Sequence, residues 1–144
     1  MSTASPAAEL AAFAAELRFD AIPEPVVRFT ENLLVDWFGS AVAGHGSRPV
    51  ESIARFAQSM GPADGPSEVL INRRGSSPWL AAIANAAASH LAEQDDVHNG
   101  SVFHPATVVF PPALAVAQAI RASGQRPLAG RVGGYEGGHR GGGF

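Results

Sequence analysis

A long amphipathic pattern between Pro23 and Gly44 limits the folds open to this chain. Apolar residues recur there at spacings of three and four, which places them on one wide face of a helix. The residues on that face are Val26, Val27, Leu33, Leu34, Trp37, Phe38, Ala41 and Val42. Glycines at positions 44 and 46 end the pattern, because glycine tolerates the left-handed conformation in which many helices end. Such a helix needs other elements to cover its apolar face, so we expect a packed helical domain.

Other segments also indicate helices. Ser5-Pro6 and Ser77-Pro78 are typical of an N-cap followed by proline in the first helical turn. The predicted helices cover residues 6–20, 23–43, 49–60, 79–94 and 107–122. Pro111 and Pro112 must either kink the last helix or mark its true start. We predict an all-α fold of about five helices with little or no strand, residues 68–71 being one brief extended candidate.

The end of the chain differs from the rest in composition. Eight of the fifteen residues in GRVGGYEGGHRGGGF are glycine, and each glycine costs a helix about 0.5–1 kcal/mol relative to alanine. The 144 residues suffice for one domain with a real core. We therefore predict a helical domain over residues 1–124 and a glycine-rich tail over 125–144 that is poorly ordered unless it packs on a partner.

Composition excludes several classes of function. The chain has no cysteine, which removes disulfides, thiolate metal sites and cysteine nucleophiles. Its net charge is −3 and it has no basic stripe, so we expect no nucleic-acid binding. The longest uncharged stretch, residues 105–120, is shorter than the ~20 apolar residues of a membrane span. With no basic leader at the N-terminus, we expect a soluble, cytoplasmic protein that does not bind membranes.

One window, from position 90 to position 105, concentrates the residue types that carry chemistry. It holds three of the five histidines and three of the thirteen carboxylates. These are His90, Glu93, Asp95, Asp96, His98 and His104. The window runs from a predicted helix end through a polar loop to the next helix, and loops on a rigid scaffold often carry functional side chains.

Three interpretations of this window remain open. A carboxylate beside a histidine suits acid–base chemistry, because the ordinary pKa of histidine lies near neutrality. His90, His98 and His104 with a carboxylate would instead bind a divalent metal, although their spacing matches no compact metal motif. In the structural interpretation, His90 interacts with its helix dipole, and Asp95 and Asp96 cap the next turn.

Two arginines are weaker candidates for a binding role. The guanidinium fork of Arg73 or Arg74 matches a carboxylate of an anionic substrate, but a solvated turn is the simpler role for both. The sequence contains no lysine, so only arginines could hold the carboxylates of such a substrate.

Several motifs in the same order resemble the MmgE/PrpD family, which includes 2-methylcitrate dehydratases, cis-aconitate decarboxylases and iminodisuccinate epimerases. The resemblance begins with Leu10-Ala-Ala-Phe13 and continues through the helix Leu33–Gly44 and the alanine-rich segment Ala81–His90. The loop then shows Asp95-Asp96-x-His98 and His104-Pro105, followed by the apolar segment from Pro112, Ser123-Gly124 and Gly134-Tyr135-Glu136. Each motif is loose, but their order and spacing together are specific.

The resemblance implies roles for individual residues. His104 matches a histidine implicated in catalysis, and Asp95 and Asp96 match the family's adjacent aspartates. Glu93 falls where the family has another implicated aspartate; it keeps the charge but moves the carboxylate by one methylene. Val97 stands where threonine is common. We assign Glu93, Asp95, Asp96 and His104 to catalysis, and His98, Arg73 and Arg74 to substrate binding, with no metal and no cofactor.

The resemblance also defines two rival functions. One is a lyase-type enzyme, or a fragment of one, related to 2-methylcitrate dehydratase and acting on small polycarboxylates; the family is commonly dimeric, so a homodimer is expected. Family enzymes are much longer and close a smaller α/β domain over the site, so we expect this chain to stop before the site is complete. The alternative is a non-catalytic, truncated helical module that associates with itself or with a longer relative. A metal-binding module is a third option.

Overall fold

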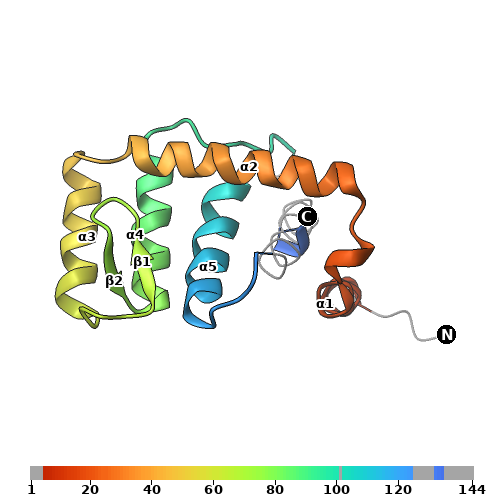
Figure 1. Ribbon diagram of the computed structural model, residues 1–144. Coiled ribbons are helices and arrows are strands. Elements are labelled where there is room, and N and C mark those ends of the chain that lie inside the picture. Colours follow the sequence, from red (N-terminus) through yellow and green to blue (C-terminus); the bar gives the residue numbers. More distant parts are fainter. Residues whose placement is uncertain (1–4, 101, 125–131, 135–144) are drawn as a thin grey trace.

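The computed structural model describes residues 5–100, 102–124 and 132–134, and they are mostly helical (Figure 1). The elements are α1 (Pro6–Glu16), a 3₁₀ turn (Phe19–Ala21), α2 (Glu24–Ala43), α3 (Arg48–Met60), β1 (Ser67–Val69), β2 (Arg74–Ser76), α4 (Pro78–Leu91) and α5 (Pro105–Ala119). The predicted all-α class with about five helices is confirmed. None of these helices is long and apolar enough to cross a membrane.

Helix α4 is the centre of the arrangement. In Figure 1, α3, α4 and α5 stand side by side, α2 crosses them, and α1 lies at the far end. Helix α4 contacts α2, α3, α5 and both strands. It begins as the serine–proline signature predicts, since Ser77 Oγ accepts the Leu80 N–H at 3.4 Å. The Ser5 hydroxyl caps α1 in the same way.

Small residues on α4 let its neighbours approach closely. Ala81, Ala84 and Ala88 are almost fully buried and face the surrounding elements. Gly44, at the end of α2, lies so near that a Cβ there would sit 2.3 Å from the Ala88 carbonyl oxygen. The alanine-rich composition of this helix therefore allows the crossing with α2, as the sequence indicates.

Two apolar clusters form the core. One lies among α3, α4, β1 and α5 and is built mainly from alanine, with Val69 as its largest buried member. The other joins α2 to α5 through Trp37 and Phe110, whose ring centroids are 5.7 Å apart. Burial of these two large rings holds α5, and with it His104 at the end of the loop that follows α4, against the scaffold.

A two-stranded hairpin contacts α4, and the sequence predicted only one extended segment in this region. Residues 67–69 pair in antiparallel fashion with residues 74–76, so the predicted extended piece exists but gains a partner strand. Asn85 of α4 fixes the hairpin: its side chain accepts the Leu70 N–H at 2.8 Å and donates to the Glu68 carbonyl at 2.9 Å. Two buried backbone groups of the hairpin are thereby satisfied.

Several expected details differ in the structure. Helix α5 begins at Pro105 and contains both Pro111 and Pro112, so neither proline marks its start. On α2 the apolar face is narrower than predicted, because Phe38 and Val42 are 42% and 52% exposed. The predicted tail, 125–144, lies outside the described residues except for 132–134, where Gly134 approaches Val109 of α5.

Candidate active site

The end of α4 and the start of α5 bring two histidines together. After α4 ends at Leu91, Glu93 takes a positive φ of 51° and its N–H reaches the His90 carbonyl at 3.0 Å. The chain then makes a loop whose backbone is bridged between His98 and Phe103. Because α4 and α5 pack side by side, the loop returns His104 to His90, and the ring centroids of the two histidines are 4.8 Å apart.

Asp95 is the centre of the cluster. Its side chain is fully buried, whereas those of His90 and His104 are 51% and 38% exposed. Its Oδ2 atom lies 3.0 Å from His90 Nδ1 and 3.3 Å from His104 Nδ1, and it accepts the Thr107 hydroxyl at 2.6 Å. One carboxylate oxygen therefore contacts a side chain of α4 and side chains at the start of α5.

Thr107 extends this network into the core. Its single hydroxyl proton is donated to Asp95, so in the 3.2 Å contact with Ser89 Oγ only Ser89 could donate. The Ser89 hydroxyl also lies 3.0 Å from the Ala86 carbonyl oxygen, to which it donates. The Ser89 proton is therefore shared between the Ala86 carbonyl and Thr107, whereas the Thr107 proton goes to Asp95. Ser89 is fully buried in α4, so these contacts connect the carboxylate to the central helix of the fold.

The contact of His104 with Asp95 is the looser of the two. His90 Nδ1 makes a hydrogen bond to Oδ2, but His104 Nδ1, although only 3.3 Å away, lacks hydrogen-bond geometry. Within the described part of the chain, neither this nitrogen nor the buried Oδ1 of Asp95 has a hydrogen-bond partner. Both atoms belong to the same cluster, so a small rotation of the carboxylate would let Oδ1 satisfy His104.

The surroundings keep the Asp95 carboxyl ionised. Burial alone raises the pKa of this group, but the hydrogen bonds from Thr107 and His90 and the charges of His104 and His90 outweigh burial. The net effect lowers the pKa of Asp95 below its ordinary value of 3.8. The site therefore presents a fixed negative charge to two imidazoles near neutral pH.

Asp96 has a structural role beside the site. Its Oδ1 accepts the Ala106 N–H at 2.8 Å and so caps the first turn of α5, as the structural interpretation of the adjacent aspartates predicts. His104 is the residue preceding that helix and makes no side-chain cap of its own. Asp96 thereby helps to place His104 at the helix start.

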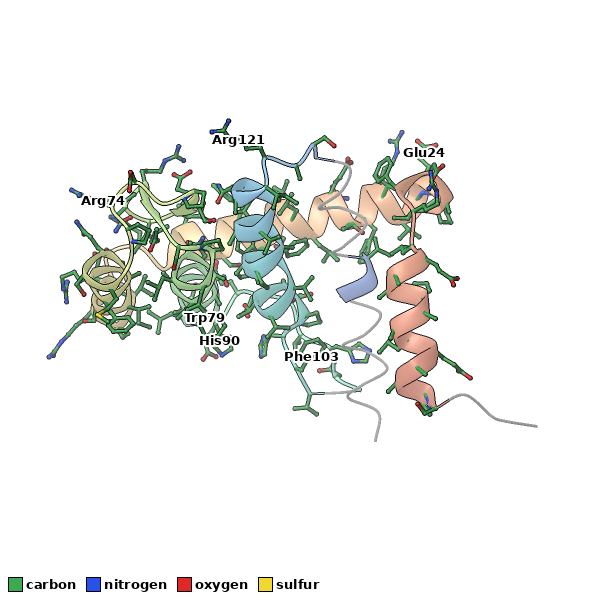
Figure 2. All side chains as sticks on the ribbon, turned by 90° about the horizontal axis from the view of Figure 1, so that it is seen from below. Glu24, Arg74, Trp79, His90, Phe103 and Arg121 are labelled. Atoms are coloured by element: carbon green, nitrogen blue, oxygen red, sulfur yellow. The ribbon has the colours of Figure 1, made fainter. Side chains whose placement is uncertain are left out.

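The other predicted site residues lie outside this cluster. Glu93 is exposed, and His98 is held through its backbone bridge to Phe103. Arg73 pairs with Glu68 of the hairpin at 2.6 Å. Figure 2 shows Arg74 and His90 on opposite sides of α4, so the structure does not bring the two arginines to the histidines.

Metal-ligand spacing is present, but hydrogen bonding also explains it. The ligand atoms of His90, Asp95 and His104 lie within 4.8 Å of one another. The separations of 3.0 and 3.3 Å between nitrogen and carboxylate oxygen are those of hydrogen-bonded or contacting pairs. We therefore assign no metal ligands here.

Sequence reasoning did not single out Thr107 and Ser89, and it kept His90 only as a metal ligand or a helix-end residue. A weak signal was present: Thr107 follows His104 by three residues, which places the two on one face of α5. The sequence contained no comparable signal for Ser89, because it lies within a run of small residues that all favour close packing.

The comparisons with known proteins decide the family. The model of the MmgE/PrpD N-terminal domain matches residues 8–142. The chain belongs to the MmgE/PrpD family. It is also similar to the cis-aconitate decarboxylase-like protein oryM of Aspergillus oryzae, at 30% identity over 119 residues. That match covers 83% of this chain but 24% of the relative, so the chain spans about a quarter of that protein's length. No solved structure matches.

Membership in the MmgE/PrpD family confirms the resemblance seen in the sequence. It makes the chain a relative of the family's dehydratases and decarboxylases. The cluster of Asp95, His90 and His104 lies within the segment that the family model matches.

Proposed function

We propose that this chain carries the histidine–carboxylate part of a lyase active site that acts on small polycarboxylates. The observation that carries the proposal is the buried Asp95 carboxylate in contact with the Nδ1 atoms of His90 and His104. The similarity to a protein named cis-aconitate decarboxylase-like favours the same substrate class.

The proposed chemistry is proton transfer at a carbon next to a carboxylate. An imidazole whose Nδ1 faces a buried aspartate is held in one tautomer, with Nε2 available to take or give a proton. The same aspartate stabilises the imidazolium that forms. Because the side chains of both histidines are partly exposed, a substrate can reach them without unfolding of the loop.

Substrate binding needs cations that the described site does not supply. Arg73 is occupied by Glu68, and Arg74 lies on the other side of α4 (Figure 2). The chain has no lysine. We infer weak binding of polycarboxylates by this chain alone and stronger binding in an assembly that adds positive charge to the cluster.

The test is proton NMR of the chain mixed separately with 2-methylcitrate, cis-aconitate and iminodisuccinate. We expect one of the three to be consumed by the wild-type chain and not by His104→Ala. His45→Ala is the matched control, because His45 is an exposed residue in the turn after α2. Equal rates in wild type and His104→Ala would overturn the assignment of His104.

A second candidate function is a helical module that pairs with a second copy of itself. Exposed apolar side chains favour it: Val35, Phe38 and Val42 follow one another at spacings of three and four on α2, and Trp79 on α4 is 73% exposed. Sedimentation velocity with Phe38→Glu tests it. A dimer that dissociates in the variant supports pairing through α2, and a wild-type monomer at high concentration excludes it.

A further inference from the structure

His90 lies at the end of α4, and its imidazole contacts both Asp95 and the ring of His104. It reaches Asp95 with better hydrogen-bond geometry than His104 does, and its ring lies edge-on to the ring of His104. Figure 2 shows His90 at the side of α4 that faces away from the hairpin. Its side chain is the more exposed of the two, at 51%.

We propose that His90 and His104 form an acid–base pair that acts on one substrate, with Asp95 as their common anchor. The inference rests on the proposed function and adds His90 to it as a second catalytic residue. Asp95 approaches each ring at Nδ1, so the atom left on each ring for chemistry is Nε2. Because the ring centroids are 4.8 Å apart, one small acid can contact both imidazoles at the same time.

Asp95 suits the role of a shared anchor because its hydrogen bonding is incomplete. Oδ2 holds His90 and Thr107, while Oδ1 and His104 Nδ1 remain unpaired within the described residues. When the proton moves from one imidazole to the other, the carboxylate can rotate to favour the ring that has become charged. The hydrogen bond from Thr107 limits that rotation from the core side.

A paired site favours elimination of a leaving group over a reaction that needs only one proton transfer. One neutral imidazole takes the proton from the carbon next to the carboxylate, and the C–H electrons form the new double bond. The C–O bond to the neighbouring hydroxyl breaks, and the other, protonated imidazole gives its proton to the departing oxygen, which leaves as water. The pair keeps the same number of protons, and the balance is the loss of one water from a hydroxylated polycarboxylate.

The experiment uses His90→Ala and His104→Ala with 2-methylcitrate, which carries a hydroxyl group, in the presence and absence of free imidazole. We expect each variant to lose at least about 100-fold in kcat, as removal of an acid–base group does. Because His90 is half-exposed, added imidazole should restore part of the rate of His90→Ala. A purely structural residue would not respond to imidazole.

The outcomes separate this inference from the function on which it rests. A His90→Ala rate near that of wild type, or a loss that imidazole does not restore while His104→Ala stays inactive, overturns the pair and leaves His104 as the single group. A wild-type chain that converts none of the three acids overturns the proposed function itself. In that case, NMR of the histidine rings tests whether Asp95 contacts both imidazoles. Asp95→Asn should shift the ring signals of both His90 and His104, and a shift of only one would refute a shared contact.

Discussion

The hydroxyl of Thr107 should contribute more to stability than an ordinary buried hydroxyl. It donates at 2.6 Å to a carboxylate whose side chain is fully buried, and its oxygen lies 3.2 Å from Ser89 Oγ. A hydrogen bond to a charged group contributes about 1.5–3 kcal/mol, against about 0.5–1.5 kcal/mol for a neutral one. Thr107→Val keeps the shape and removes the hydroxyl, so we expect a loss of about 2 kcal/mol in the free energy of unfolding at pH 7.

Thr30 provides a matched control on α2. It is also a buried helical threonine, but its hydroxyl donates to a backbone carbonyl, that of Val26, at 2.8 Å. We expect Thr30→Val to cost about 1 kcal/mol or less. For a domain of this size, 1 kcal/mol shifts the melting temperature by about 3–4 °C, so the two variants should differ by several degrees in thermal unfolding followed by circular dichroism. Equal losses in both variants would refute the reasoning.

The pH dependence of the Thr107 effect has a defined sign. The pKa of Asp95 in the folded chain is lowered below 3.8, so the stability it contributes is present above that pH and is lost as pH falls through the folded-state pKa. Removing the Thr107 hydroxyl removes one cause of the lowering. The stability gap between wild type and Thr107→Val should therefore be full at pH 7 and at pH 5 and should narrow below about pH 4.

Two further predictions concern the scaffold that holds the site. Asn85→Leu should lower the free energy of unfolding by about 2–4 kcal/mol in urea titration, because two buried backbone groups of the hairpin lose their partner; a loss below about 0.5 kcal/mol would contradict that role. Gly44→Ala should destabilise by about 1–3 kcal/mol because its Cβ would meet the Ala88 carbonyl oxygen at 2.3 Å, whereas Gly39→Ala, which points into open space, should stabilise α2 by about 0.5–1 kcal/mol. If both substitutions changed the free energy of unfolding in the same direction, the close approach of Gly44 to Ala88 would not determine stability at that position.

Local patterns predicted the helices well because their signals are local. The serine–proline pairs at Ser5 and Ser77 begin α1 and α4 with the expected caps. The start of α5 was harder to predict, because Pro111 and Pro112 lie inside the helix. Phe110 and Pro111 are among its buried residues. Tertiary burial there outweighs the local cost of proline.

The hairpin and the burial of α2 depend on partners that the sequence does not reveal. Asn85 holds Glu68 of β1 and the adjacent Leu70, and β2 pairs with β1. In the sequence, Asn85 is only one polar residue within an alanine-rich helix. Phe38 and Val42 fit the apolar period of α2, yet no described element covers them fully. Periodicity identifies a face that favours burial but not the neighbour that would bury it.

The candidate site could be located from the sequence but not assembled. The density of histidines and carboxylates indicated the window, and the family resemblance selected Asp95 and His104. The partnership of His90 with Asp95, and the support from Thr107 and Ser89, follow from the packing of α4 against α5. Arg73 and Arg74, which were candidates for substrate binding, lie in the hairpin, away from the histidines.

The most direct test of the proton-transfer account is deuterium exchange into the substrate. The wild-type chain and Asp95→Asn would each be incubated with 2-methylcitrate, cis-aconitate or iminodisuccinate in deuterated buffer, and the carbon-bound protons next to the carboxylates followed by proton NMR. We predict deuterium uptake by at least one acid with the wild-type chain and a loss of that uptake in Asp95→Asn. Uptake that is unchanged in Asp95→Asn, or absent with all three acids, would contradict the account.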